Sequence, residues 1–355
     1  MRSERASQRP PGDEAGRRDG SPAGGAPRVL VAGGAGFLGS HLCERLVGAG
    51  AQVVCLDSFL TGRRENLAAL LGDERFALVE GDVVDPLPAA VADQPFDQIY
   101  NLACVASPTL YQDDPEHTLM TSVTGTQRLL RLAESRGARL FFASTSEVYG
   151  DPLTHPQREG DWGNVSCTGP RACYDEGKRA AEALAFDFER KGRAQVRVAR
   201  IFNTYGPRLT ADDGRVVPRM IGQALAGEDI TLFGDGSQTR SFCYVDDMIE
   251  GLVRLMNCDG PQPGPVNLGD PLEITVLALA ERILALTGSA SRIERRPLPV
   301  DDPRRRRPDI SLAGARLDWR PTTGLDQGLA ATIDWMRGQP ASAGEAAGAP
   351  ALASA

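Results

Sequence analysis

One apolar run leads directly into closely spaced glycines: Arg28-Val29-Leu30-Val31-Ala32-Gly33-Gly34-Ala35-Gly36-Phe37-Leu38-Gly39. Residues 40–47 follow with helical spacing. A strand before the glycines and a helix after them are the context of a dinucleotide-binding fingerprint, although a glycine-rich turn without a ligand is the alternative. Missing side chains let a pyrophosphate approach backbone amides at the helix N-terminus, where the helix dipole favours anions. The expected contacts in this run are Gly33, Gly36, Phe37, Leu38 and Gly39.

Strands and helices alternate from this run onward. Apolar segments typical of strands stand at residues 52–56, 76–80, 98–103, 140–143 and 196–201. Helical spacing runs from 118 to 134 and from 174 to about 192. Alternation at this spacing predicts an α/β fold, a Rossmann-like doubly wound parallel sheet that binds ligands at the carboxyl ends of its strands.

Polar residues at these strand ends indicate which nucleotide binds. Asp57 ends the second strand, about twenty residues beyond the glycines, where a carboxylate accepts hydrogen bonds from both ribose hydroxyls. This favours NAD over NADP, while Arg63 and Arg64 lie just beyond and could meet a 2′-phosphate. A carboxylate beside an amide on the third strand can read the adenine edge. The other cofactor contacts that we expect at strand ends are Asp82, Val83 and Leu102.

The alternation becomes irregular beyond about residue 206. An amphipathic segment at 217–226 and a strand at 230–233 are followed by a helix and another strand, which predicts a smaller C-terminal substrate-binding lobe threaded with returns to the main sheet. Both chain ends lack an apolar pattern and are rich in small or polar residues. The expected units are a disordered leader at 1–27, an NAD-binding domain at 28–205 with returning segments at about 240–270, the lobe at 206–239 and 271–337, and a disordered tail at 338–355.

A Tyr174-x-x-x-Lys178 pair follows the segment Thr145-Ser146-Glu147, which carries hydroxyls and a carboxylate. On a helix, positions i and i+4 share one face, so the phenol and the ammonium can point into one cleft. A free tyrosine has a pKa near ~10, and a cation held close stabilises the phenolate and lowers that pKa. The phenolate can take the proton from a sugar hydroxyl while hydride leaves its carbon. Combined with the glycine fingerprint, the pair predicts NAD-dependent chemistry, with both side chains beside the cofactor.

Composition excludes several classes of protein. The 355 residues are 41% hydrophobic and 24% charged, which is typical of a globular chain. The balance of 39 basic against 47 acidic residues gives a net charge of −8, so we expect no nucleic-acid partner. Seven cysteines without Cys-x-x-Cys spacing and only three histidines predict no metal site, no disulfide framework and a cytoplasmic location. We expect no membrane span, because no run of about eighteen apolar residues occurs.

Longer motifs carry a resemblance. They are Thr145-Ser146-Glu147-Val148-Tyr149-Gly150, Gly169-Pro170-Arg171-Ala172-Cys173-Tyr174-Asp175-Glu176-Gly177-Lys178, Ala199-Arg200-Ile201-Phe202-Asn203-Thr204-Tyr205-Gly206-Pro207-Arg208, and Asp301-Asp302-Pro303 before an arginine run. On these motifs the chain from 28 to about 337 resembles the extended short-chain dehydrogenase/reductases of the NAD-dependent epimerase/dehydratase family. Within that family it is similar to the UDP-glucuronate decarboxylases, which form UDP-xylose.

The resemblance implies roles for residues of this chain. Thr145, Tyr174 and Lys178 would serve oxidation at sugar C4. Ser146, Glu147 and Arg240 would handle the sugar carboxylate and the protonation that follows loss of CO2. Asn203, Arg215 and Arg306 would hold the nucleotide and its diphosphate. The other expected substrate contacts are Ser107, Glu147 and Arg240. The resemblance also implies a homodimer that packs the Tyr174 helix and a neighbouring helix into a four-helix interface.

The chain departs from the family pattern at three places. Val105 replaces a proline, Ser122 stands where an asparagine is common, and Ser166-Cys167-Thr168 replaces Asn-Pro-Ile. The first and third border the expected substrate site, so the preferred sugar or the fate of the keto intermediate could differ.

Three rival functions stay open. A nucleotide-sugar 4,6-dehydratase shares the fold and cofactor, but its family uses an Asp-Glu pair where this chain has Ser146-Glu147. A 4-epimerase needs no carboxylate at position 147. A non-catalytic NAD-bound scaffold would be expected to lack the tyrosine or the lysine, and Tyr174 and Lys178 are both present.

Overall fold

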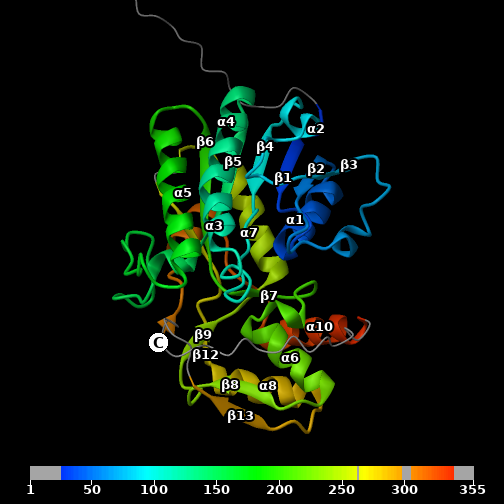
Figure 1. Cartoon of the computed structure of the whole chain (residues 1–355), viewed down its shortest axis with the longest axis vertical. Coiled ribbons are helices and arrows are strands. Elements are labelled where there is room, and N and C mark those ends of the chain that lie inside the picture. The colour runs from blue at the N-terminus through cyan, green and yellow to red at the C-terminus, as the bar shows by residue number, and fades with distance from the viewer. Residues whose placement is uncertain (1–24, 262–263, 298–304, 340–355) are drawn as a thin grey trace, which may run out of the picture.

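The computed structural model describes residues 25–261, 264–297 and 305–339. Its larger part is one parallel sheet of seven strands in the order β11-β6-β5-β4-β1-β2-β3 (Figure 1). These strands are β1 Arg28–Ala32, β2 Gln52–Asp57, β3 Phe76–Glu80, β4 Gln98–Asn101, β5 Arg139–Thr145, β6 Gln195–Ile201 and β11 Val266–Leu268. The strand order reverses between β1 and β4, where a doubly wound sheet binds its ligand. The predicted α/β fold is confirmed.

Alternation of apolar residues along each strand builds a core on both faces of the sheet. On β1, Val29 and Val31 enter one core, whereas Leu30 and Ala32 enter the other. The first core includes α1 Phe37–Gly48, α7 Val245–Asn257 and α9 Ser311–Leu317. The opposite core includes α2 Ala89–Ala92, α4 Thr126–Arg136 and α5 Ala172–Arg190. Both faces of the sheet are therefore covered by helices, and the edge strand β3 keeps exposed residues.

The helix expected at 118–134 is interrupted. It begins earlier, as α3 Pro115–Met120, because Asp114 caps it by accepting a hydrogen bond from the backbone N–H of His117 at 3.0 Å. A π-helical segment, η2 Thr121–Gly125, then separates α3 from α4. The spacing of apolar residues does not reveal this single π-helical turn, because the helices on either side of it keep their buried faces.

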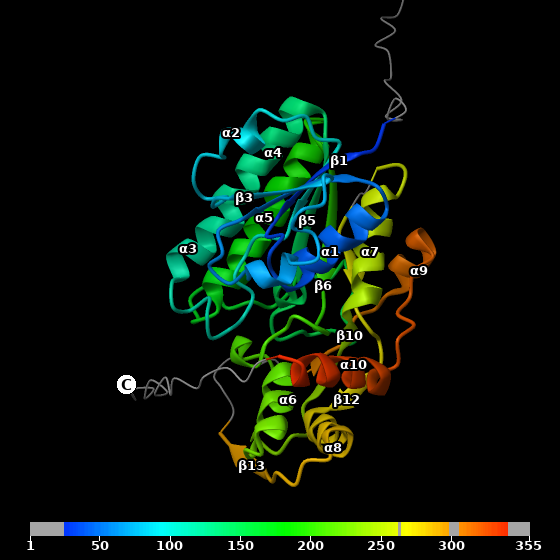
Figure 2. The same cartoon turned by 90° about the vertical axis from the view of Figure 1, so that its right-hand side faces the viewer.

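A smaller lobe lies below the sheet in Figure 1. Its elements are α6 Val216–Ala226, β8 Ile230–Phe233, α8 Val276–Thr287, β13 Ile293–Arg296 and α10 Leu325–Arg337. They share a separate apolar core that includes Met220, Ile230 and Leu279. Figure 2 shows α6, α8 and α10 packed together beneath the sheet. The α9 helix falls inside the range expected for this lobe but packs on the main sheet.

Short elements join the two parts. The short strands are β7 Thr204–Tyr205, β9 Thr239–Ser241, β10 Cys243–Tyr244, β12 Glu273–Thr275 and β14 Arg305–Arg306. Short helices are η1 Arg64–Leu67, η3 Ser146–Tyr149 and η4 Ala211–Asp213. Because β14 pairs with β9 in parallel register, Arg306 stands opposite Arg240 although the two are far apart in sequence.

Some expectations lie outside the described residues. They include most of the leader at 1–24, the tail at 340–355 and the motif Asp301-Asp302-Pro303. Within the described ranges, none of the helices is both long and apolar enough to cross a membrane.

Candidate active site

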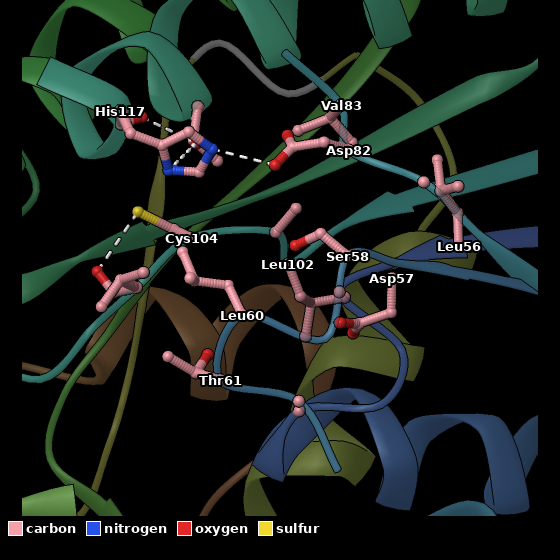
Figure 3. A pocket seen from close by; sticks show the side chains of 17 residues that line it. Leu56, Asp57, Ser58, Leu60, Thr61, Asp82, Val83, Leu102, Cys104 and His117 are labelled. Atoms are coloured by element: carbon pink, nitrogen blue, oxygen red, sulfur yellow. Dashed lines mark hydrogen bonds and ion pairs between the residues drawn. The ribbon is translucent and has the colours of Figure 1, made fainter. Parts of the chain in front are cut away.

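A pocket opens at the carboxyl ends of β1, β2, β3 and β4 (Figure 3). Its lining includes six expected cofactor contacts, which are Gly33, Gly36, Asp57, Asp82, Val83 and Leu102. Residues 58–62, between β2 and η1, form another part of the wall. The pocket therefore lies at the switch point that the strand order defines.

The glycine run fits a dinucleotide. Gly33 has φ +79°, and a Cβ there would lie 2.7 Å from the backbone nitrogen of Ala103. A Cβ on Gly39 would lie 2.0 Å from the carbonyl oxygen of Gly33, so the turn and α1 touch backbone to backbone. Helix α1 has no side-chain cap and no acidic residue in its first turn. Its N-terminal amides are thus suited to an anionic pyrophosphate.

Asp57 ties the end of β2 to the glycine run. Its carboxylate accepts hydrogen bonds from the backbone N–H groups of Ala35 and Phe59, each at 2.8 Å. Burial raises the pKa of Asp57, and these backbone hydrogen bonds oppose the rise. Two carboxylate oxygens offer about four lone pairs, so these backbone donors still leave acceptor capacity for a ribose hydroxyl.

The two arginines that could meet a 2′-phosphate are paired elsewhere. Arg63 forms an ion pair of 2.7 Å with Asp212 of η4, and Arg64 contacts Glu80 at 3.4 Å. A 2′-phosphate would have to compete with these carboxylates for both guanidinium groups. This arrangement favours NAD over NADP.

Tyr174 and Lys178 lie together on α5, as the spacing predicts. Lys178 donates a hydrogen bond from Nζ to the carbonyl oxygen of Ala143 at 2.9 Å, and Nζ lies 5.8 Å from the centroid of the Tyr174 ring. The Tyr174 ring stacks on Tyr111, with centroids 5.0 Å apart and planes 1° from parallel. Thr145, at the end of β5, contributes a hydrogen bond to Tyr174. The phenol, the ammonium and the hydroxyl therefore share one cleft.

The prediction that Lys178 lowers the pKa of Tyr174 is wrong for these side chains as they stand. Burial raises the pKa of Tyr174 above its ordinary value, and the hydrogen bond from Thr145 only partly opposes that rise. Burial also lowers the pKa of Lys178. Removal of both groups from water therefore outweighs their attraction.

Glu147 is the centre of a buried charge cluster. Arg306 holds it with two contacts, Nη1 to Oε1 at 2.6 Å and Nη2 to Oε2 at 2.8 Å. Arg171 adds a contact from Nη2 to Oε2 at 2.8 Å. Burial alone would raise the pKa of Glu147, but the charges of Arg306 and Arg171 hold that pKa below its ordinary value, with a further contribution from Arg240. Glu147 is thus a carboxylate at neutral pH.

Sequence reasoning missed two members of this neighbourhood. Arg171 belongs to one of the sequence motifs, but no function was predicted for it. In the structure, Arg171 and Arg306 both form ion pairs with Glu147. Asp175 is 7% exposed, and its Oδ1 has no hydrogen-bond partner among the described residues. Burial and the charge of Glu147 raise the pKa of Asp175 to about 7.

We expect Asp175→Asn to change how stability depends on pH. A carboxyl whose folded pKa rises from 3.8 to about 7 destabilises the fold progressively as pH rises across that range, and the amide lacks this effect. The variant's advantage in free energy of unfolding should therefore grow between pH 5 and pH 8 by at most about 3 kcal/mol. Urea unfolding at both pH values measures it. Asp187→Asn, which removes an exposed carboxylate from the same helix, is the control, and an equal growth in both variants would contradict the prediction.

The remaining expected substrate contacts are more dispersed. Asn203 accepts a 3.5 Å contact from Arg306 and so borders the Glu147 cluster. Arg215 pairs with Asp213, and its guanidinium lies 6.0 Å from the ring of Phe37 at the start of α1. Ser107 is buried and donates its hydroxyl to the backbone carbonyl of Asp213.

Four further residues of the expected site are buried or partly buried in the structure. Arg240 donates to the carbonyl oxygen of Thr239 at 2.9 Å and is 7% exposed. Ser146 is buried at the start of η3. Phe37 and Leu38 pack against the core that contains α1 and α7. Glu147, Asn203, Arg240 and Arg306 therefore lie close together in the structure. Ser107 and Arg215 instead contact Asp213 of η4, which precedes α6 of the lobe.

The departures from the family pattern differ in position. Val105 packs with Tyr111 and Tyr174 in one small cluster. Ser122 lies in η2, 3.5 Å from Cys104 Sγ, and is buried. Residues 166–168 are exposed. The first two therefore lie around Tyr174 and the cofactor pocket. Among the described residues, no three His, Cys, Asp or Glu side chains gather in a group that could hold a metal ion.

Comparison with known proteins supplies independent findings. A family model described as "NAD dependent epimerase/dehydratase family" matches residues 29–269. UDP-glucuronic acid decarboxylase 1 of Arabidopsis thaliana is 52% identical over 302 residues, which cover 85% of this chain and 68% of that protein. UDP-glucuronic acid decarboxylase 1 of Danio rerio is 51% identical over 308 residues, covering 87% of this chain and 72% of that protein.

A solved structure agrees in fold over almost its whole length. It is UDP-glucuronic acid 4-epimerase from Bacillus cereus in complex with UDP-glucuronic acid and NAD. The similarity has a TM-score of 0.79 at 27% identity and covers 87% of this chain and 99% of that chain.

Proposed function

The chain belongs to the NAD-dependent epimerase/dehydratase family, and from this premise we propose that it is an NAD-dependent UDP-glucuronate decarboxylase. The reaction converts UDP-glucuronic acid to UDP-xylose by oxidation at C4, loss of CO2 and reduction at C4. The observation that carries the proposal is the Glu147 cluster, in which a buried carboxylate is bound by Arg306 and Arg171 close to Tyr174. The relatives that are about 50% identical to this chain are named UDP-glucuronic acid decarboxylases, which supports the proposal.

The guanidinium groups of the cluster give the substrate carboxylate a binding site. Arg306 and Arg171 are largely buried and already bind Glu147, so a second carboxylate beside them would share charge-assisted hydrogen bonds from these guanidinium groups with Glu147. Glu147 keeps these cations oriented before the substrate arrives. A neutral 6-hydroxymethyl sugar would leave the same cations with less compensation, so the cluster favours a uronic acid.

Proton movement at C4 is the proposed task of Tyr174. As the phenolate, its Oη would take the proton of the C4 hydroxyl and later return it, with Lys178 and Thr145 beside the ring. Because burial raises the pKa of Tyr174, the phenol must first lose its own proton before it can act as this base. NAD, when bound, supplies the hydride acceptor at C4 and returns the hydride after CO2 has left. The residues proposed to hold NAD are the pocket residues Gly33, Gly36, Asp57, Asp82, Val83 and Leu102, with Phe37, Leu38 and Gly39 at the start of α1 and Tyr174 and Lys178 on α5.

Loss of CO2 needs little help from the protein. Oxidation at C4 places a carbonyl β to the carboxylate, so the electrons of the breaking C–C bond flow into an enolate. Glu147 and Arg240 are proposed to control the proton that then returns to C5. Because the pKa of Glu147 is held below its ordinary value, Glu147 itself must first acquire a proton if it is the donor.

The test is incubation of the full chain with UDP-glucuronic acid, with and without added NAD, followed by NMR and mass spectrometry of the sugar. Appearance of UDP-xylose or its 4-keto precursor supports the proposal. Unchanged UDP-glucuronic acid in the presence of bound NAD would overturn it. UDP-galacturonic acid would show the epimerase alternative, and dTDP-glucose tests the dehydratase.

We also propose that the chain acts as a cytoplasmic homodimer. The outward side of α5 carries the small, exposed residues Ala180 and Ala183, which allow another helix to approach closely. Figure 1 places α5 at the outer edge of the domain. Sedimentation at working concentration should give twice the mass of one chain, and a monomer would remove the proposal.

A further inference from the structure

His117 is a pocket residue that neither the motifs nor the proposed reaction uses. It belongs to α3, which follows β4, and it lines the pocket with Asp82 and Val83 (Figure 3). Its Nε2 lies 2.9 Å from Oδ2 of Asp82, and the two side chains remain 28% and 20% exposed. In Figure 3 the pair stands on the opposite side of the pocket from Leu60 and Thr61.

Both nitrogens of the His117 ring face polar neighbours. Nε2 faces the Asp82 carboxylate, and Nδ1 lies 3.5 Å from Oγ1 of Thr121. That hydroxyl donates its own hydrogen to the carbonyl oxygen of His117 at 2.8 Å, so its hydrogen is directed away from the ring. With polar neighbours at both nitrogens, the face of the ring is what the imidazole can still offer a ligand, and a planar aromatic group is the ligand that such a face binds.

Both carboxylate oxygens of Asp82 also have partners within the protein. Its Oδ1 accepts a hydrogen bond from the backbone N–H of Val84 at 2.9 Å, while Oδ2 is bound to His117. One lone pair of each oxygen remains for a donor from the pocket. A planar group with an exocyclic amino group would thus find an aromatic surface and an acceptor side by side.

We propose that His117 is the aromatic contact for the adenine ring of NAD, beside the Asp82 carboxylate that is already expected to read the adenine edge. The proposal rests on the proposed function only in taking NAD as the cofactor. It assigns the adenosine half of NAD to the wall formed by α3 and β3, whereas the nicotinamide half belongs near Tyr174. His117 is then a cofactor-binding residue that takes no part in the chemistry.

The experiment measures binding of the two halves of NAD separately. Full chain freed of nucleotide is titrated calorimetrically with ADP-ribose and, in parallel, with nicotinamide mononucleotide. His117→Ala should weaken ADP-ribose about tenfold, since stacking on a base contributes about 1–3 kcal/mol. Affinity for the mononucleotide should stay unchanged. His117→Phe should keep most of the ADP-ribose affinity, and His117→Gln should behave like the alanine variant.

A matched control is available in His155, which pairs with Glu273 at 3.1 Å and has a similar side-chain exposure of 24% outside the pocket. His155→Ala should leave both titrations unchanged. An unchanged ADP-ribose affinity in His117→Ala would overturn the proposal, and so would an equal loss for both ligands, which indicates general damage to the fold. Because neither titration contains a sugar nucleotide substrate, failure here is distinguishable from failure of the decarboxylase assignment.

Discussion

Replacing Tyr174 by phenylalanine is expected to lower kcat for UDP-glucuronic acid by about 10³-fold, because it removes the only group proposed to accept the C4 proton. The phenylalanine ring can keep the stack on Tyr111, in which the planes lie 1° from parallel, so the fold should survive. Neither UDP-xylose nor its 4-keto precursor should accumulate. The measurement is the initial rate of CO2 release, with thermal unfolding as a check on structure.

Tyr111→Phe is the matched control for this variant. Tyr111 is the other ring of the same stack, and its hydroxyl has no hydrogen-bond partner within the described residues. Removing that hydroxyl should therefore leave kcat within about twofold of the wild-type value. Retention of more than about a tenth of the activity in Tyr174→Phe would show that another group moves the proton.

The fold was predictable because its signals are local. The β1 strand and the glycines that follow it are adjacent in sequence, and β3 begins and ends where the apolar pattern does. The Tyr174 and Lys178 pair was predictable for the same reason, since one helical turn brings them together. The interruption at η2 was not, because a π-helical segment leaves the apolar spacing on either side intact.

The charge cluster could be predicted only in part, because its contacts are long-range. Arg306 reaches Glu147 across 159 positions through the pairing of β14 with β9, and sequence reasoning had assigned it to the diphosphate. The pKa of Tyr174 was misjudged for a related reason. Spacing reveals that a cation is near, but burial, which dominates the shift, depends on the whole fold. Burial is also the main reason why the pKa of Asp175 is raised to about 7.

Glu147→Gln is expected to lower kcat by about 10²-fold while the KM for UDP-glucuronic acid falls or stays unchanged. The amide removes the negative charge that compensates Arg306 and Arg171, so these cations become better partners for the substrate carboxylate. Control of the proton at C5 is lost at the same time, and the ratio of 4-keto precursor to UDP-xylose should rise. Product analysis by NMR, alongside steady-state kinetics, measures both effects.

Two further variants serve as comparisons for Glu147→Gln. Arg240→Ala should also release keto precursor if it shares the control of C5, but its KM should rise, because it removes a cation from the cluster instead of an anion. Glu176→Gln, which changes a half-exposed carboxylate paired with Arg179 on α5, should alter neither quantity. The ion pairs of Glu147 form above its lowered pKa and are lost only as pH falls through that value. The difference in free energy of unfolding between Glu147→Gln and the wild type should therefore be constant from pH 6 to pH 8. A KM that rises in Glu147→Gln, with no keto precursor released, would show that Glu147 binds the sugar directly and does not hold the cations in readiness for its carboxylate.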